Sequence, residues 1–191
     1  MQDHRSIRMI EKPLFTPHIF SSKENAIEIL RRIHYKFRIH KNPCNKFTVT
    51  KEQYANYFKF AFIRNPWSRT YSWYMNVMRD ENHKRFLKIT RPLSLNEFLR
   101  LYKGKGALRP QTCWIKDFRG SIPLDYIGRF ENLNEDFEKV CKLMNIGPFT
   151  LPHEIKGTAT DYREEYDKES INIIDESHKE EIELFSYSFE S

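Results

Sequence analysis

The feature that most constrains this chain is a short apolar segment, Phe58–Ile63, which is followed at once by a signal for the start of a helix. Aromatic and aliphatic residues dominate the segment, and this pattern predicts a buried β-strand. Asn65 suits the residue that caps a helix, and Pro66 suits the first helical position. We therefore predict a helix from Pro66 to about Arg79 that begins where the strand ends.

A second amphipathic helix is predicted over residues 22–38. Ser21 and Glu24 have the spacing of a capping box, in which each side chain accepts a hydrogen bond from the other residue's backbone N–H. Four apolar residues then recur at helical spacing: Ala26, Leu30, Ile33 and Phe37.

The remaining segments alternate between strand and helix. A second short strand is predicted over residues 125–128, and irregular structure is predicted over residues 1–20. Capping signals or apolar spacing predict further helices over residues 50–57, 94–102, 110–114, 132–145 and 168–185. Strands that alternate with helices predict an α/β fold with a small, mostly parallel sheet flanked by helices.

Composition narrows the class of protein. A chain of 191 residues, with 39% hydrophobic and 30% charged residues, is typical of one globular domain with a substantial core. No stretch approaches the roughly 20 apolar residues of a membrane span, and the N-terminus lacks a secretory signal. The three cysteines and seven histidines show neither a disulfide framework nor a metal-binding spacing. We therefore expect no metal and, for the chain as given, a cytoplasmic location.

Charge is distributed unevenly along the chain. Residues 1–120 contain 25 Lys and Arg against 9 Asp and Glu, whereas residues 121–191 contain 7 against 17. A basic first part predicts an anionic ligand, and attraction between the two parts of the chain is the alternative. No recognised nucleic-acid-binding module accompanies the charge, so we do not expect a nucleic-acid partner.

The junction between strand and helix predicts a phosphate site. A helix N-terminus presents unpaired N–H groups and the positive end of the helix dipole. Arg64 lies on the turn, where its guanidinium can hold a phosphate with two parallel hydrogen bonds, and Arg69 adds charge. Ser68 and Ser72 lie four residues apart, so both hydroxyls share one helix face. The alternative is an arginine paired with an acidic neighbour and serines that face solvent.

Here the sequence resembles a known family. The segment KFAFIRNPWSRTYSWY is similar to the 3′-phosphate-binding segment of sulfotransferases that use 3′-phosphoadenosine 5′-phosphosulfate (PAPS), especially the carbohydrate sulfotransferases. Two later segments, DYIGRFENLNEDFEKVCKLMNI and the final 30 or so residues, also resemble that family in the same order. The resemblance covers residues 46–191, whereas residues 1–45 are divergent. It implies a single domain over residues 1–191 with a fold like that of P-loop nucleotide triphosphatases.

The resemblance also implies roles for individual residues. Arg64 and Ser72 have the family's spacing for the pair that binds the 3′-phosphate, with Arg69 in support. Phe130 matches an aromatic residue that contacts adenine, and a core aromatic is the alternative. Lys156 matches a loop that reaches over the 3′-phosphate, and an exposed lysine is the alternative.

The catalytic base that the resemblance implies is a histidine upstream of Arg64. His40 is the first choice and His34 the second, although Lys46 stands where the segment KFTVTKEQY would carry a histidine. The alternative for His40 is an exposed histidine in a loop.

One element of the family is missing from this sequence. Family members carry an N-terminal motif, PKxGxTS, whose loop holds the 5′-phosphosulfate, but this chain has no glycine before Gly104. Glycine is needed there because the loop must wrap closely around phosphate. Three explanations stay open. The first is that the chain is a truncated form of a longer enzyme, which could be anchored in a membrane of the secretory pathway, so that its domain is incomplete at the N-terminus. The second is that it is a degenerate homologue. The third is that other residues form the 5′ site.

The expected function is transfer of a sulfuryl group from PAPS, as co-substrate, to a hydroxyl of a carbohydrate. The acceptor is an anionic glycan if the remaining basic residues contact it. The alternative is a catalytically inactive domain of the same fold that binds nucleotide or glycan. Neither the identity of the acceptor nor the oligomeric state follows from the sequence.

Overall fold

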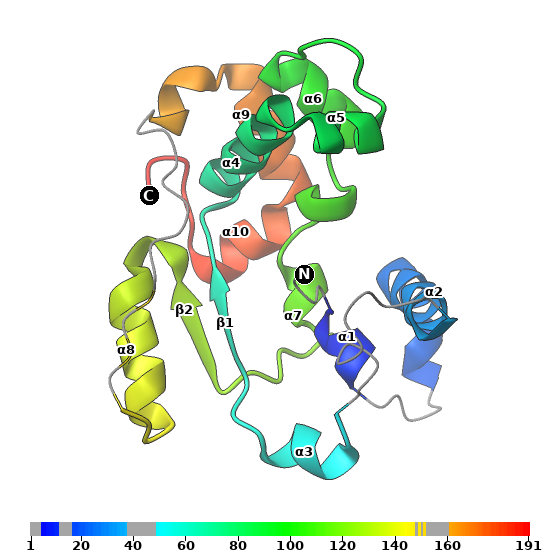
Figure 1. Ribbon diagram of the computed structural model, residues 1–191, viewed down its shortest axis with the longest axis vertical. Helices are drawn as coiled ribbons and strands as arrows, with labels where there is room; N and C mark the ends of the chain where they lie inside the picture. Colours follow the sequence, from blue (N-terminus) through cyan, green and yellow to red (C-terminus); the bar gives the residue numbers. More distant parts are fainter. Residues whose placement is uncertain (1–4, 12–16, 38–48, 148, 150, 152–160) are drawn as a thin grey trace. The chain divides into compact units, whose positions relative to one another are not determined.

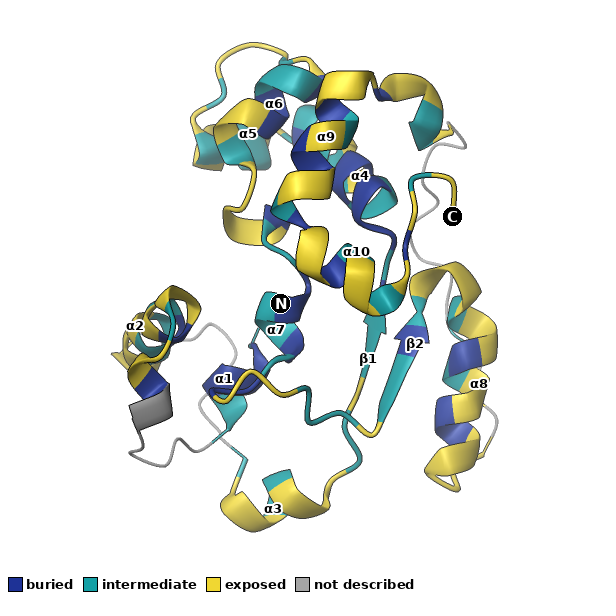
Figure 2. Cartoon of the chain, turned by 180° about the vertical axis from the view of Figure 1, so that it is seen from behind, coloured by how far each residue is buried: buried dark blue, intermediate teal, exposed yellow. Residues whose placement is uncertain are grey.

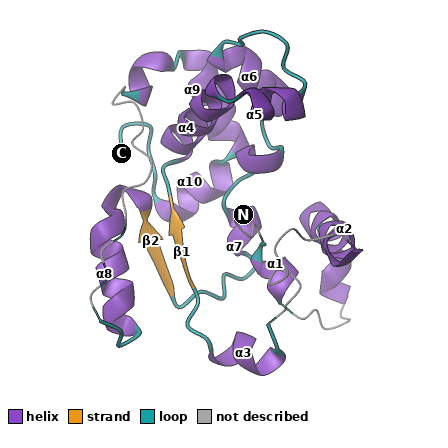
Figure 3. Ribbon diagram, in the orientation of Figure 1, coloured by secondary structure: helices purple, strands orange, loops and turns teal. Residues whose placement is uncertain are grey.

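A computed structural model of the chain describes residues 5–11, 17–37, 49–147, 149, 151 and 161–191 (Figure 1). This part is mostly helical and contains a two-stranded parallel sheet (Figure 3). The α/β class with a small parallel sheet is therefore confirmed. The chain forms two compact units, residues 1–61 with 111–127 and residues 62–110 with 128–191. The single domain over residues 1–191 stays a prediction.

The described helices divide between the two units. The first unit contains α1 (Ile7–Ile10), η1 (Pro17–Phe20), α2 (Lys23–Phe37), α3 (Lys51–Asn56) and α7 (Thr112–Ile115). The second unit contains α4 (Pro66–Arg79), α5 (Glu81–Leu87), α6 (Leu95–Tyr102), η3 (Gly106–Leu108), η4 (Phe130–Asn132), α8 (Leu133–Leu143), η5 (Tyr162–Glu165), α9 (Lys168–Ser177) and α10 (Lys179–Phe185). The two strands, β1 (Phe60–Ile63) and β2 (Tyr126–Arg129), contain residues of both units. None of the described helices is long and apolar enough to cross a membrane.

The predicted junction of strand and helix is confirmed. Helix α4 begins at Pro66, and the Asn65 carboxamide oxygen accepts hydrogen bonds from the N–H groups of Trp67 and Ser68. The strand is shorter than predicted and less buried, because only Ile63 is fully buried and Phe60 is 39% exposed. The signals for the helix start are local, which is why the sequence predicts its boundaries well.

Helix α2 forms where it was predicted, but its apolar face is exposed. Leu30, Ile33 and Phe37 are 67%, 51% and 79% exposed, whereas the polar residues Asn25 and Glu28 are fully buried. Figure 2 shows that α2 has both exposed and buried residues along its length. Spacing alone shows that a helix is amphipathic, and it does not show which face meets the protein.

Polar contacts explain the burial of the other face of α2. Glu28 accepts a hydrogen bond of 2.6 Å from the Ser6 hydroxyl and one of 2.7 Å from Arg31. Asn25 donates to the carbonyl of Phe118 at 2.9 Å. The predicted cap at Ser21 is wrong by one residue, since the helix begins at Lys23 and the Ser22 hydroxyl accepts from the Asn25 N–H.

The second unit has an aromatic core between α4, α6 and η3. Val77, Phe98 and Leu108 are almost completely buried at its centre. Seven partly buried hydrophobic side chains pack around them: Trp73, Tyr74, Met78, Leu87, Ile89, Leu93 and Tyr102. The Tyr102 hydroxyl donates to the carbonyl of Leu87 at 2.9 Å, so this partly buried polar group has a partner.

Two helix predictions differ from the structure in this unit. Helix α5 was not predicted, because its residues lack apolar periodicity; Asp80 caps it by accepting from Asn82 and His83. The single helix predicted over 168–185 is two helices, α9 and α10, which meet at His178. The backbone of His178 departs from helical geometry, with φ of −119° and ψ of 15°.

Gly128 allows the strand β2 to lie close to its neighbours. A Cβ atom at this position would lie 2.6 Å from two ring carbons of Phe62 and 3.0 Å from the Cβ of Asp136. The Asp136 carboxylate also accepts the N–H of Arg129 at 2.7 Å, which ties α8 to the end of β2. A side chain at residue 128 would therefore displace either the ring of Phe62 or helix α8.

Candidate functional site

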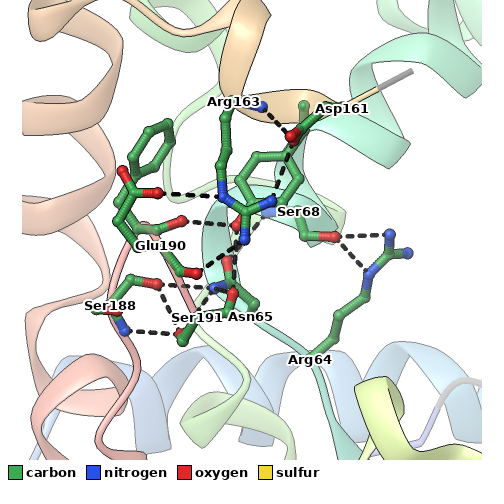
Figure 4. Close-up of polar contacts among 10 residues, drawn as sticks. Arg64, Asn65, Ser68, Asp161, Arg163, Ser188, Glu190 and Ser191 are labelled. Atoms are coloured by element: carbon green, nitrogen blue, oxygen red, sulfur yellow. Dashed lines mark hydrogen bonds and ion pairs between the residues drawn. The ribbon is translucent and has the colours of Figure 1, made fainter. Parts of the chain in front are cut away.

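Arg64 leaves the end of β1 and turns its guanidinium toward the first turn of α4. Its Nε and Nη2 donate to the Ser68 hydroxyl at 3.1 Å and 2.8 Å (Figure 4). Its Cζ lies 4.6 Å from the centre of the Phe130 ring. Burial lowers the pKa of Arg64, while the Glu131 carboxylate and Tyr162 raise it. The side chain keeps its charge at neutral pH because the pKa of arginine is so high.

The backbone at the start of α4 does not offer unpaired N–H groups, and the prediction that it does is wrong. The Asn65 N–H donates to Glu131 at 2.7 Å, and Pro66 has no N–H. The carboxamide oxygen of Asn65 accepts from Trp67 at 3.0 Å and from Ser68 at 3.2 Å. An anion at this end of α4 would therefore bind through side chains rather than backbone N–H groups. The carboxylate of Glu131 is itself an anionic group beside the start of the helix.

The two predicted serines share one face of α4 but differ in their contacts. Ser68 is half-buried, and its hydroxyl accepts from Arg64. Ser72 is exposed, and its hydroxyl has no hydrogen-bond partner among the residues that the structure describes. Arg64, on the turn before α4, is thus bonded to Ser68 in the first turn of the helix, and Ser72 follows one turn further along with an exposed hydroxyl that is available to a ligand.

Arg69 forms hydrogen bonds that link α4 to the segment around η3 in the second unit. Its Nη2 donates to the carbonyls of Ala107 and, at 2.9 Å, of Arg109. These bonds hold the segment around η3 against α4. The predicted supporting role of Arg69 at a phosphate is not tested by these contacts.

Phe130 and Glu131 follow β2 and lie beside the turn that carries Arg64. Phe130 is 46% exposed, although the guanidinium of Arg64 lies over its ring. Its contact with adenine stays a prediction. Glu131 accepts the Asn65 N–H with one oxygen and, with the other, the Tyr187 hydroxyl at 3.1 Å.

Sequence reasoning missed two parts of this site. The sequence predicts a role for Phe130 but none for the carboxylate of its neighbour Glu131, which accepts the Asn65 N–H. Residues 187–191 were not connected with the turn at all, although they contact Asn65 in the structure (Figure 4). These partners are more than 60 and 120 residues away from Asn65 in the sequence, and no local pattern indicates such contacts.

Two predicted residues lie outside the described part of the chain. These are His40, the predicted base, and Lys156, the predicted phosphate contact. The second choice of base, His34, lies near the end of α2 in the first unit and is exposed. Within the described residues, no group of three or more His, Cys, Asp or Glu side chains could hold a metal ion.

Comparison with known proteins identifies the family of the chain. A family model described as "Sulfotransferase family" matches residues 14–188. An uncharacterized protein of Archaeoglobus fulgidus is 35% identical over 116 residues, which are 59% of this chain and 88% of that protein. No solved structure matches the chain. Because the family match covers nearly the whole chain and includes the strand–turn–helix segment with Arg64, the protein belongs to the sulfotransferase family.

Proposed function

We propose that this protein transfers a sulfuryl group from PAPS to a hydroxyl of a carbohydrate. The observation that carries the proposal is Arg64 at the start of α4, bonded to Ser68 on that helix with Ser72 one turn further along, in a chain of the sulfotransferase family. Arg64 supplies a fixed positive charge with a planar array of donors, which suits a phosphate. Ser72 supplies an exposed hydroxyl two turns along the helix. Together they hold the 3′-phosphate of the nucleotide.

The reaction assigns roles to the other predicted residues. The acceptor oxygen forms a bond to sulfur as the bond between sulfur and the leaving phosphate oxygen breaks. His40 takes the proton of the acceptor hydroxyl as the general base. Phe130 contacts the adenine, Lys156 reaches the 3′-phosphate and Arg69 adds positive charge. The proposal includes one domain over residues 1–191 with the P-loop-like fold of the family.

We further propose that the acceptor is an anionic glycan. Between Arg79 and Arg109, the chain has nine basic residues against three acidic ones. Arg85, Lys88 and Lys103 are exposed there and have no ion-pair partner in the described part of the chain. Exposed, unneutralised cations in one segment favour an anionic partner. A sulfated or carboxylated oligosaccharide is then converted faster than a neutral one, and this preference declines as the salt concentration rises.

Calorimetry with adenosine 3′,5′-bisphosphate tests the nucleotide site. The parent protein is expected to bind, and Arg64→Ala is expected to lose about 2 kcal/mol of binding free energy, since a hydrogen bond to a charged group contributes that much. Arg119→Ala, which removes an exposed arginine from the first unit, is the matched control. Equal affinities of the parent and Arg64→Ala would show that the site is wrongly placed.

A second function remains consistent with one observation. The chain has no PKxGxTS motif and no glycine before Gly104, so an inactive domain that binds nucleotide or glycan is the alternative. Turnover of PAPS with a panel of glycans separates the two. Sulfated product identifies a transferase, whereas nucleotide binding without any product from the panel identifies an inactive relative.

A further inference from the structure

Residues 187–191 fold back onto the turn between β1 and α4. The carboxamide nitrogen of Asn65 donates to the carbonyls of Ser188 and Ser191, both at 2.9 Å, and lies 3.2 Å from the Ser191 hydroxyl (Figure 4). Asn65 is 1% exposed, whereas Ser188 and Ser191 are exposed, so these bonds are partly buried. A buried side chain is thus bonded to a segment more than 120 residues away.

The same carboxamide also fixes the start of α4. Its oxygen accepts from Trp67 and Ser68, while its nitrogen contacts the segment 187–191. The backbone N–H of Asn65 donates to Glu131. Every polar group of this residue that can restrain the turn therefore has a partner, and the partners come from three separate parts of the chain.

The segment 187–191 is itself held in place. The ring of Phe189 lies edge-on to three aromatic rings, with centroid distances of 5.9 Å to Trp67, 5.7 Å to Tyr162 and 5.6 Å to Tyr166. The Tyr162 hydroxyl donates to the carbonyl of Phe189 at 2.7 Å. Edge-to-face aromatic pairs of this kind add stability beyond the burial of area.

Ionic and buried polar contacts hold the two ends of the segment. Arg163 donates to the carbonyl of Glu190 at 2.9 Å, and its Nε lies 3.5 Å from the carboxylate of that residue. Tyr187 is buried and donates to Glu131. Because the segment 187–191 is held in place, its bonds to Asn65 can limit movement of the turn between β1 and α4.

We propose that Asn65 and the segment 187–191 are positioning elements of the nucleotide site, an inference that rests on the proposed function. Arg64 immediately precedes Asn65, and the guanidinium of Arg64 is bonded to Ser68, whose N–H is held by Asn65. A shift of the turn moves the guanidinium and the serine together. The segment 187–191 prevents that shift through its bonds to Asn65, so Arg64 and the α4 hydroxyls keep the spacing that a 3′-phosphate requires.

Asn65→Ser separates the two tasks of the carboxamide. Serine also caps helices well, so the start of α4 is retained, but serine cannot reach the carbonyls of residues 188 and 191. The variant adds no charge near the phosphate. Phe189→Ala provides an independent route, because it removes the aromatic anchor of the segment without changing the turn. Leu184→Ala, a truncation of a half-exposed side chain on α10, is the control.

The measurement compares two nucleotides by calorimetry, adenosine 3′,5′-bisphosphate and adenosine 5′-monophosphate. In Asn65→Ser and in Phe189→Ala, affinity for the bisphosphate is expected to fall about tenfold, and affinity for the monophosphate less than about twofold. A merely structural role would lower both affinities equally. In an Arg64→Ala background, Asn65→Ser is expected to cause a smaller further loss of bisphosphate affinity than in the parent, because the cation that it positions is absent and only the α4 hydroxyls are left.

The outcomes separate this inference from the proposed function. If the parent protein and Arg64→Ala bind the bisphosphate equally, the proposed site is wrong and the positioning role is overturned with it. If the parent depends on Arg64 but both segment variants bind like the parent, only the positioning role is overturned. Equal losses for the two nucleotides also overturn it. Melting curves of each variant show whether the protein is folded, and Phe189→Ala decides the matter if Asn65→Ser does not fold.

Discussion

The guanidinium of Arg64 lies 4.6 Å above the ring of Phe130 and donates from two nitrogens to the Ser68 hydroxyl. The cation–π contact with Phe130 and the two hydrogen bonds to Ser68 together restrain the guanidinium. Arg64 is therefore oriented before any ligand binds. An oriented cation loses less conformational entropy on binding than a free one does.

Lysine cannot replace this arginine. Arg64→Lys keeps the charge but loses the planar donors and the stacking on Phe130. We expect the affinity for adenosine 3′,5′-bisphosphate to fall about tenfold, with little change in the melting temperature. Calorimetry of the variant at constant ionic strength measures the first quantity. If Arg64→Lys binds like the parent, charge alone accounts for the contribution of Arg64.

The two serines of α4 are expected to differ in their effect on nucleotide binding and on stability. Ser72→Ala should weaken bisphosphate binding about fivefold without lowering the melting temperature, because the exposed hydroxyl has no described partner to lose. Ser68→Ala should weaken binding and also release Arg64. Titration calorimetry and thermal melts of both variants give the comparison. Unchanged binding by Ser72→Ala would mean that the ligand does not reach the second turn.

Gly128→Ala is expected to destabilise the protein by about 1–3 kcal/mol, since the new methyl group would overlap the ring of Phe62. Gly147→Ala is the matched control. A methyl group added at Gly147 would meet no atom of the described residues within 4 Å, so the stability should change by less than about 0.5 kcal/mol. Urea unfolding of the two variants measures the difference. Equal stabilities would indicate that β2 moves away from Phe62 without cost.

In helix α2, substitution of a buried polar residue should lower the stability of the protein more than substitution of an exposed apolar residue. Glu28→Ala leaves the buried Ser6 hydroxyl without its acceptor, which costs about 1–3 kcal/mol of unfolding free energy. Ile33→Ala truncates a side chain that is 51% exposed, and we expect a change below about 0.5 kcal/mol. Urea denaturation of both variants tests the order, and a larger loss in Ile33→Ala would show that the apolar face is covered.

His178 is expected to make stability depend on pH. Burial, together with the charge of Arg69, lowers the pKa of His178 from an ordinary 6.5 to about 4. Between these values the unfolded chain binds a proton that the folded protein does not. The free energy of unfolding is therefore highest with respect to His178 above pH 6.5. It decreases as the pH falls from 6.5 to 4, and His178 causes no further change below pH 4.

Over this pH interval, His178 is expected to lower the free energy of unfolding by on the order of 3 kcal/mol. His178→Gln removes the titrating group, so the difference between the unfolding free energies of parent and variant should change between pH 6.5 and 4. Urea unfolding at a series of pH values measures this difference. A difference that is constant over the interval would contradict the assignment.

Local signals predicted helix starts well and failed for contacts between distant residues. Thr50 with Gln53 and Ser94 with Glu97 form capping boxes at the starts of two predicted helices. Such starts are predictable because each box depends on only four consecutive residues. The division of the last helix at His178 was missed because the residues around it carry no glycine or proline to signal an interruption.

The sequence by itself determined the strand–turn–helix at Arg64 and the membership of the sulfotransferase family, since both depend on the order of residues in short segments. Tertiary structure alone decided that the N–H of Asn65 is bonded to Glu131, and that residues 187–191 lie against Asn65. It also decided that α2 buries its polar face. These outcomes depend on hydrogen bonds and packing between residues that are far apart in the chain, and a pattern within one segment carries no information about them.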